Sequence, residues 1–102
     1  MPVTPVPEQA ADGSATAAAQ AVGLQALAFV AGDQILLERF LSLSGLDLEA
    51  LRDRAESPEL LAGVLDFLLA NERDLFAFCE YSGLGPEAPA RYRHLLADPP
   101  PT

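Results

Sequence analysis

Apolar residues recur along this chain at intervals of three and four positions, which is the spacing of one face of an α-helix. Residues 58–70 show the pattern clearly, because Leu61, Val64, Leu65 and Leu68 fall on one side of such a helix. No stretch alternates apolar and polar residues over five positions with β-branched character, so no strand is predicted. The pattern predicts an all-α fold, a compact bundle of five to six short helices.

Helix start signals divide this pattern into segments. Asp33, Asp47, Ser57 and Asn71 each precede an apolar run and can accept hydrogen bonds from the first N–H groups of a helix. Gly45 follows the second run and is expected to end that helix in the left-handed conformation. The predicted helices cover about residues 16–31, 34–43, 48–56, 58–70, 72–82 and 87–97.

The two ends of the chain differ in composition from its middle. Residues 1–13 contain three prolines and no cluster of large aliphatic side chains, and residues 98–102 read Asp-Pro-Pro-Pro-Thr. Such segments bury too little apolar surface to offset the entropy lost on ordering. We expect a flexible N-terminal arm over residues 1–13, a single helical domain over 14–97, and a flexible proline-rich tail over 98–102.

A pseudo-repeat relates the two halves of the helical region at a spacing of 38 residues. Aligning residues 24–51 with 62–89 gives nine identical pairs among 28, and the same Ser-Gly-Leu sequence ends the second and the fifth predicted helix. We interpret this as two tandem three-helix units, 16–56 and 57–97, each of which buries its apolar side against the other. Chance similarity between leucine-rich helices is the alternative explanation.

Composition supports the helical prediction and limits the partners. Leu and Ala make up more than a third of the chain, and both are good helix formers. The formal net charge is −9, with 15 Asp and Glu, six Arg and no Lys. Because nucleic-acid binding depends mainly on neutralising phosphates with basic residues, we expect no direct nucleic-acid contact.

Residues 13–32 carry no charge over a length that approaches the thickness of a bilayer. The segment nevertheless contains Ser14, Gln20 and Gln25, and no basic residue flanks it. These features favour a buried central helix over a membrane span. The N-terminus also lacks the basic region and compact leucine-rich run of a secretory signal, so we expect a cytoplasmic protein.

Side chains suited to catalysis or metal binding are scarce. His94 and Cys79 are the only residues of their types, and neither has a nucleophile, base or metal ligand at a characteristic spacing. Cys79 falls on the predicted inward stripe of its helix, which is typical of a small buried side chain. Glu49, Asp53 and Glu56 share one helix side with interleaved arginines, as on a solvated surface. We expect no cofactor, no metal and no enzymatic activity.

Residues 40–55 resemble a helix-turn-helix in outline, with two helices joined through Ser-Gly-Leu. The second helix with its cap, residues 47–56, carries four acidic residues against two arginines, a balance that DNA phosphates would repel. Direct DNA reading is therefore disfavoured. A transcription accessory factor remains an alternative function.

Some apolar residues fall where the two repeats differ, at positions that are polar in the other copy. Phe76 corresponds to Glu38 of the first repeat, and Ile35 and Leu36 correspond to charged residues of the second. Together with Tyr81, which we place near Phe76, these apolar residues are candidates for docking a partner. The alternative is that the contact between the units, or the first helix, covers them.

The sequence resembles an uncharacterised family of short bacterial proteins, domain-of-unknown-function family 3572, which is concentrated in alphaproteobacteria. The resemblance covers about residues 20–97 and is carried mainly by the segments VLDFLLANE at 64–72 and GLGPEAPAR at 83–91. Members often have Asp where this chain has Gly85. The resemblance implies a small cytoplasmic all-helical protein and supplies no activity, cofactor or site. Gene neighbourhood in the family suggests a single-domain response regulator as a partner.

The sequence as a whole predicts a small acidic helical protein that acts as a protein–protein interaction or regulatory module. It would dock an apolar patch framed by acidic residues on a protein partner. The alternatives are a small-ligand binder or enzyme that uses a pocket between the two units, and a transcription accessory factor.

Overall fold

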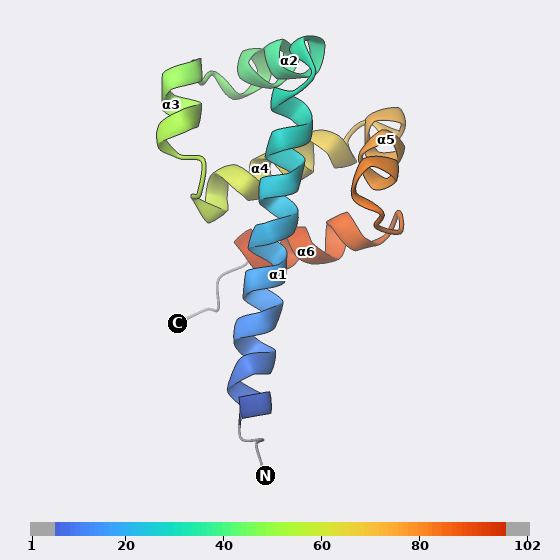
Figure 1. Cartoon of the computed structure of the whole chain (residues 1–102). Helices are drawn as coiled ribbons and strands as arrows, with labels where there is room; N and C mark the ends of the chain where they lie inside the picture. Colours follow the sequence, from blue (N-terminus) through green and yellow to red (C-terminus); the bar gives the residue numbers. More distant parts are fainter. Residues whose placement is uncertain (1–5, 98–102) are drawn as a thin grey trace.

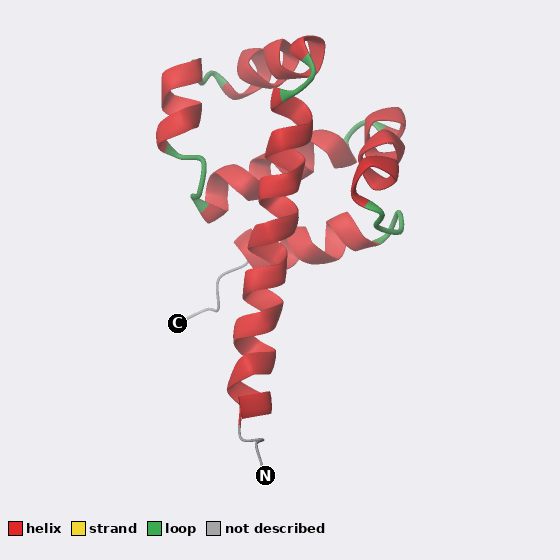
Figure 2. Ribbon diagram, viewed as in Figure 1, coloured by secondary structure: helices red, strands yellow, loops and turns green. Residues whose placement is uncertain are grey.

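Six α-helices follow one another in the computed structural model, which describes the backbone of residues 6–97 and the side chains of residues 16–96 (Figure 1). Short loops join the helices, and no strand occurs within residues 6–97 (Figure 2). The predicted all-α fold is confirmed. The helices are α1 Val6–Ala31, α2 Gln34–Ser44, α3 Leu48–Asp53, α4 Pro58–Leu69, α5 Glu72–Ser82 and α6 Ala88–Ala97.

The predicted caps begin four of these helices. The side chains of Asp33, Asp47, Ser57 and Asn71 each accept a hydrogen bond from a backbone N–H two or three residues further along, at 2.8–3.3 Å. These bonds satisfy N–H groups that have no partner inside the helix. The starts of α2, α3, α4 and α5 are therefore set by local sequence and confirm the prediction.

Helix α4 forms the centre of the fold, with α1 and α6 packed against it and against each other (Figure 1). The predicted stripe Leu61, Val64, Leu65 and Leu68 is completely buried. Where α1 crosses α4 the two backbones approach closely, and a Cβ atom on Gly23 would lie only 2.7 Å from the Cβ of Leu61. Glycine is therefore required at this crossing.

Helices α2 and α5 flank this centre, and each inserts one aromatic ring into the core. The ring of Phe40 on α2 meets that of Phe67 edge-on at 5.4 Å between centroids. The ring of Phe78 on α5 is fully buried and lies 5.7 Å from that of Phe29 on α1. The outer helices are therefore held to the central helices by apolar contacts.

The 38-residue spacing reappears in α2 and α5. Their bounds correspond at this spacing, and Gly45 and Gly83 end them in the left-handed conformation, with φ of 77° and 82°. The third helices do not correspond. Helix α3 has six residues and lies at the edge of the fold, whereas α6 has ten residues and packs on both α1 and α4. Equivalence of two complete three-helix units therefore stays a prediction.

Helix α1 begins at Val6, about ten residues before its predicted start at Thr16, so residues 6–13 are helical where we expected a flexible arm. Of the three prolines near the N-terminus, Pro2 and Pro5 precede the helix and Pro7 stands in its first turn, where a missing N–H costs nothing. The Glu, Gln and Ala residues that follow are good helix formers. Residues 1–5 and the predicted tail 98–102 lie outside the described residues.

Among residues 16–96, whose side chains the structure describes, no single helix is long and apolar enough to cross a membrane. The segment 16–31 of α1 and the helix α2 meet these criteria only as a pair, and the two are bent by 111° relative to each other at the break between them.

Candidate functional site

The structure separates the four residues that we predicted for docking. The side chains of Phe76, Tyr81 and Ile35 are 49%, 58% and 71% exposed, whereas Leu36 is only 6% exposed. Leu36 is therefore wrong as a docking candidate. The cap at Asp33 sets the rotation of α2, and Leu36 then faces the core one turn before the buried Phe40.

Tyr81 and Phe76 do not share a surface, contrary to our expectation. The two residues are five positions apart on α5, which separates them by about 140° around the helix. The ring of Tyr81 lies 5.2 Å from that of Phe29 and 6.3 Å from that of Phe78, between centroids. Tyr81 therefore extends the aromatic core to the surface, while Phe76 belongs to a different side of α5.

Phe76 lies at the edge of a surface hollow of about 640 Å³, which we call the Phe76 hollow. Its walls come from α5 and from the loop that leads to α6. Its lining is partly apolar and includes one basic side chain, Arg73, and one acidic side chain, Glu80. The residues that line the hollow are Arg73, Phe76, Ala77, Cys79, Glu80, Gly83, Leu84 and Pro86.

Cys79 is one of the residues that line this hollow and is 8% exposed. Its Sγ lies 3.6 Å from the carbonyl oxygen of Gly85, to which the thiol donates a hydrogen bond. Burial raises the pKa of the Cys79 thiol, and the nearby Glu87 carboxylate raises it further. The thiol is protonated at neutral pH, and a protonated thiol is a poor nucleophile.

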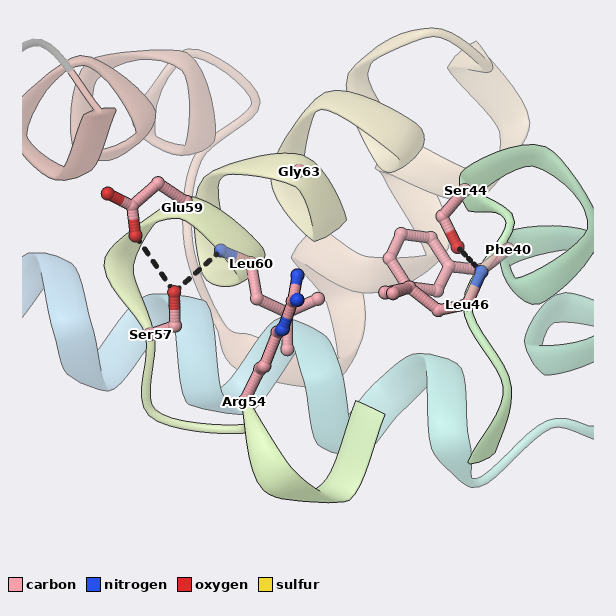
Figure 3. A pocket seen from close by; sticks show the side chains of 8 residues that line it. All are labelled: Phe40, Ser44, Leu46, Arg54, Ser57, Glu59, Leu60 and Gly63. Atoms are coloured by element: carbon pink, nitrogen blue, oxygen red, sulfur yellow. Dashed lines mark hydrogen bonds between the residues drawn. The ribbon is translucent and has the colours of Figure 1, made fainter. Parts of the chain in front are cut away.

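A second hollow of about 560 Å³ opens between the end of α2, the end of α3 and the start of α4 (Figure 3). We call it the Arg54 hollow. It joins residues from the two predicted units, as our alternative of an inter-unit pocket requires. The residues that line it are Phe40, Ser44, Leu46, Arg54, Ser57, Glu59, Leu60 and Gly63.

The Ser57 hydroxyl and the Glu59 carboxylate, which both line the Arg54 hollow, form hydrogen bonds at the start of α4. The Ser57 hydroxyl accepts a hydrogen bond from the Leu60 N–H and donates one to Glu59 Oε1 at 2.9 Å. This hydrogen bond, together with the Glu59 backbone N–H, lowers the pKa of the Glu59 carboxyl. The Glu59 carboxylate therefore stays ionised and is held at the beginning of α4.

Arg54 ends α3 and reaches across the hollow toward α4 (Figure 3). Within the part of the chain whose side chains are described, no ion pair or hydrogen bond holds its guanidinium. By contrast, Arg39 pairs with Asp74, and Arg93 pairs with Asp66 at 2.7 Å. The guanidinium of Arg91 lies 5.9 Å from the ring centre of Tyr92.

Sequence reasoning gave a pocket between the two units only as an alternative and named none of the residues that line the Arg54 hollow, although two signals were present. No acidic residue stands three or four positions from Arg54, so no helical ion pair is available to it. Gly63 occupies the interior of α4, where glycine costs about 1 kcal/mol relative to alanine. Among the described residues, no group of three His, Cys, Asp or Glu side chains is placed to hold a metal ion.

The fold defines an all-helical protein built on three central helices, α1, α4 and α6. The family described as Protein of unknown function (DUF3572) matches residues 16–99, and the chain belongs to this family. The resemblance carried by the segments at 64–72 and 83–91 is thereby confirmed. No curated protein and no solved structure matches the chain.

Proposed function

We propose that this protein is an interaction module that binds another protein through the surface of α5 around the Phe76 hollow. The observation that carries the proposal is the half-exposed ring of Phe76 beside a hollow of about 640 Å³. Aromatic side chains next to apolar depressions are the usual energetic centres of protein interfaces.

The core does not require an aromatic residue at position 76. Helix α5 is anchored by the buried residues Phe78 and Cys79, while Phe76 faces solvent. The corresponding position on α2 is Glu38, whose carboxylate accepts a hydrogen bond from Gln34 at 3.3 Å. An exposed ring where the related helix has a charged residue therefore favours a role in recognition.

The charge of the protein indicates the chemistry of the partner. The chain carries a net charge of −9, and two acidic residues, Glu80 and Glu87, lie beside the Phe76 hollow against one cation, Arg73. Such a field attracts basic proteins and repels acidic ones. The partner that fits is a protein surface with an apolar side chain for the hollow, flanked by Lys or Arg.

The proposal assigns binding without catalysis. Two described side chains support this. The buried Cys79 thiol stays protonated, and the ionised Glu59 carboxylate is held by a hydrogen bond from Ser57. Neither group is paired with a nucleophile or base that would make it reactive.

The test compares Phe76→Glu with Leu43→Glu as a matched control. Leu43 is 73% exposed on α2, so both substitutions place a charge on an exposed apolar site without touching the core. A partner identified by quantitative co-purification is then purified, and its affinity for each variant is measured by calorimetry. We expect Phe76→Glu to weaken binding by about thirtyfold or more, the loss of one interface hot spot.

Leu43→Glu should bind like the original chain, and both variants should keep the helical circular dichroism spectrum. Equal affinity of the two variants for the partner would overturn the proposal. A partner whose surface is acidic at the contact would also contradict it.

A further inference from the structure

We propose that the Arg54 hollow is a binding site for a small monocarboxylic acid with an apolar body, whose carboxylate pairs with the Arg54 guanidinium. The site is separate from the Phe76 hollow and rests on different observations. Three observations support the inference. Gly63 is a glycine that neither backbone conformation nor packing requires, the Arg54 guanidinium forms no ion pair within the described side chains, and part of the lining is apolar.

The first observation concerns Gly63, which lies in the interior of α4. Glycine there is unfavourable relative to alanine. Its backbone does not have a positive φ, and a Cβ atom at this position would meet nothing within 4 Å. This contrasts with Gly23, where a Cβ would collide with Leu61. Neither conformation nor packing explains Gly63, but a larger side chain there would project into the hollow.

The second observation concerns Arg54. Within the described side chains Arg39 and Arg93 form ion pairs, whereas Arg52, Arg54 and Arg73 form none, and what distinguishes Arg54 is the hollow that it borders. Within the described side chains the Arg54 guanidinium has no acidic partner, although it borders a hollow that also contains Glu59. The Glu59 carboxylate is turned to the Ser57 hydroxyl instead. The guanidinium therefore keeps its two-pronged donor face available for a ligand carboxylate.

The third observation indicates the chemistry of the ligand apart from its carboxylate. Phe40, Leu46 and Leu60 supply apolar walls to the same hollow. Arg54 is the only cation among its lining residues, and the ionised Glu59 stands nearby. A ligand with two or more negative charges would leave charge uncompensated and meet repulsion. A single carboxylate on an aromatic or branched apolar body satisfies both the cation and the walls.

The experiment titrates the full chain with phenylacetate and follows backbone amide signals by nuclear magnetic resonance. 2-Phenylethanol, which keeps the apolar body but lacks the charge, and phenyl phosphate, a dianion, serve as comparison ligands. We expect phenylacetate to shift the amides of Leu46 and Gly63 and to bind at least about tenfold tighter than either comparison ligand. Equal binding of phenylacetate and the alcohol, or no binding of phenylacetate, overturns the proposal.

Variants test the two key residues. Arg54→Gln should weaken phenylacetate binding by at least about tenfold, whereas Arg52→Gln, on the same helix but outside this hollow, should not. Gly63→Leu should narrow the hollow and weaken phenylacetate binding by at least about tenfold, while circular dichroism shows that the fold is kept. Binding to Arg54→Gln or Gly63→Leu at the original strength contradicts the assignment.

A further pair of ligands distinguishes the source of the carboxylate. A short peptide that ends in a free Phe carboxylate is compared with its C-terminal amide and with phenylacetate. Tighter binding of the free peptide identifies a protein chain end as the ligand, and tighter binding of phenylacetate identifies a free acid. The amide should bind weakly in either case, and an amide that binds as well as the acid overturns the role of the carboxylate.

Discussion

Replacing Gly63 with alanine tests how α4 is built. The residue lies in the interior of a twelve-residue helix, and the added Cβ would meet no atom within 4 Å. The substitution therefore gains helix propensity without a steric cost. We expect the free energy of unfolding to rise by about 0.5–1 kcal/mol. For a domain of about 100 residues, 1 kcal/mol corresponds to about 4–8 °C in Tm.

The same substitution at Gly23 should have the opposite sign. The new Cβ would lie 2.7 Å from the Cβ of Leu61 at the crossing of α1 and α4, and 3.2 Å from the Leu96 Cδ1. Both helices would have to separate, and overpacking of this kind costs about 1–3 kcal/mol, more than the gain in propensity. Gly23→Ala should therefore lower stability.

Urea unfolding followed by circular dichroism measures both variants against the original chain. The slope of the free energy against urea concentration should stay unchanged, so that the shifts in midpoint report stability alone. The reasoning is refuted if Gly23→Ala and Gly63→Ala shift the midpoint in the same direction by similar amounts. That result would mean that the crossing of α1 and α4 is not as close as described.

Three further outcomes follow from the packing. Phe78→Ala should lower the free energy of unfolding by about 3–5 kcal/mol in urea unfolding, because the ring is fully buried; a loss under 1 kcal/mol would contradict its burial. Asn71→Ala should cost about 1 kcal/mol through loss of the cap, and Asn71→Asp should restore it. Iodoacetamide should alkylate Cys79 more slowly in the folded than in the urea-unfolded chain, because burial raises its pKa; equal rates at neutral pH would contradict this.

The features that could be predicted from the sequence are the local ones. A cap such as Asn71 acts on N–H groups two or three residues away, and Gly83 ends a helix through its own backbone conformation. Neither depends on the rest of the fold. The stripe of α4 was also predictable, because a helix with apolar residues on most of its surface has to be buried.

The features that escaped prediction depend on how helices are placed relative to one another. Leu36 was a candidate surface residue from a comparison of the repeats, with burial as the alternative, and the packing of α2 places it in the core. The Arg54 hollow exists only because α2, α3 and α4 meet at their ends, and no spacing along the chain encodes that meeting. The sequence offered exposure of Phe76 as one of two alternatives, and it did not indicate the hollow beside that residue.

Photo-crosslinking from position 76 tests the central claim, that the surface around Phe76 binds a protein partner, most directly. A photoreactive phenylalanine analogue is placed at position 76 in one chain and at position 43 in another, and cross-links are formed inside cells and mapped by mass spectrometry. The account predicts one dominant partner from position 76, cross-linked at an apolar residue flanked by Lys or Arg, and none of it from position 43. The same partner cross-linked equally from both positions, or from position 43 alone, would contradict the account.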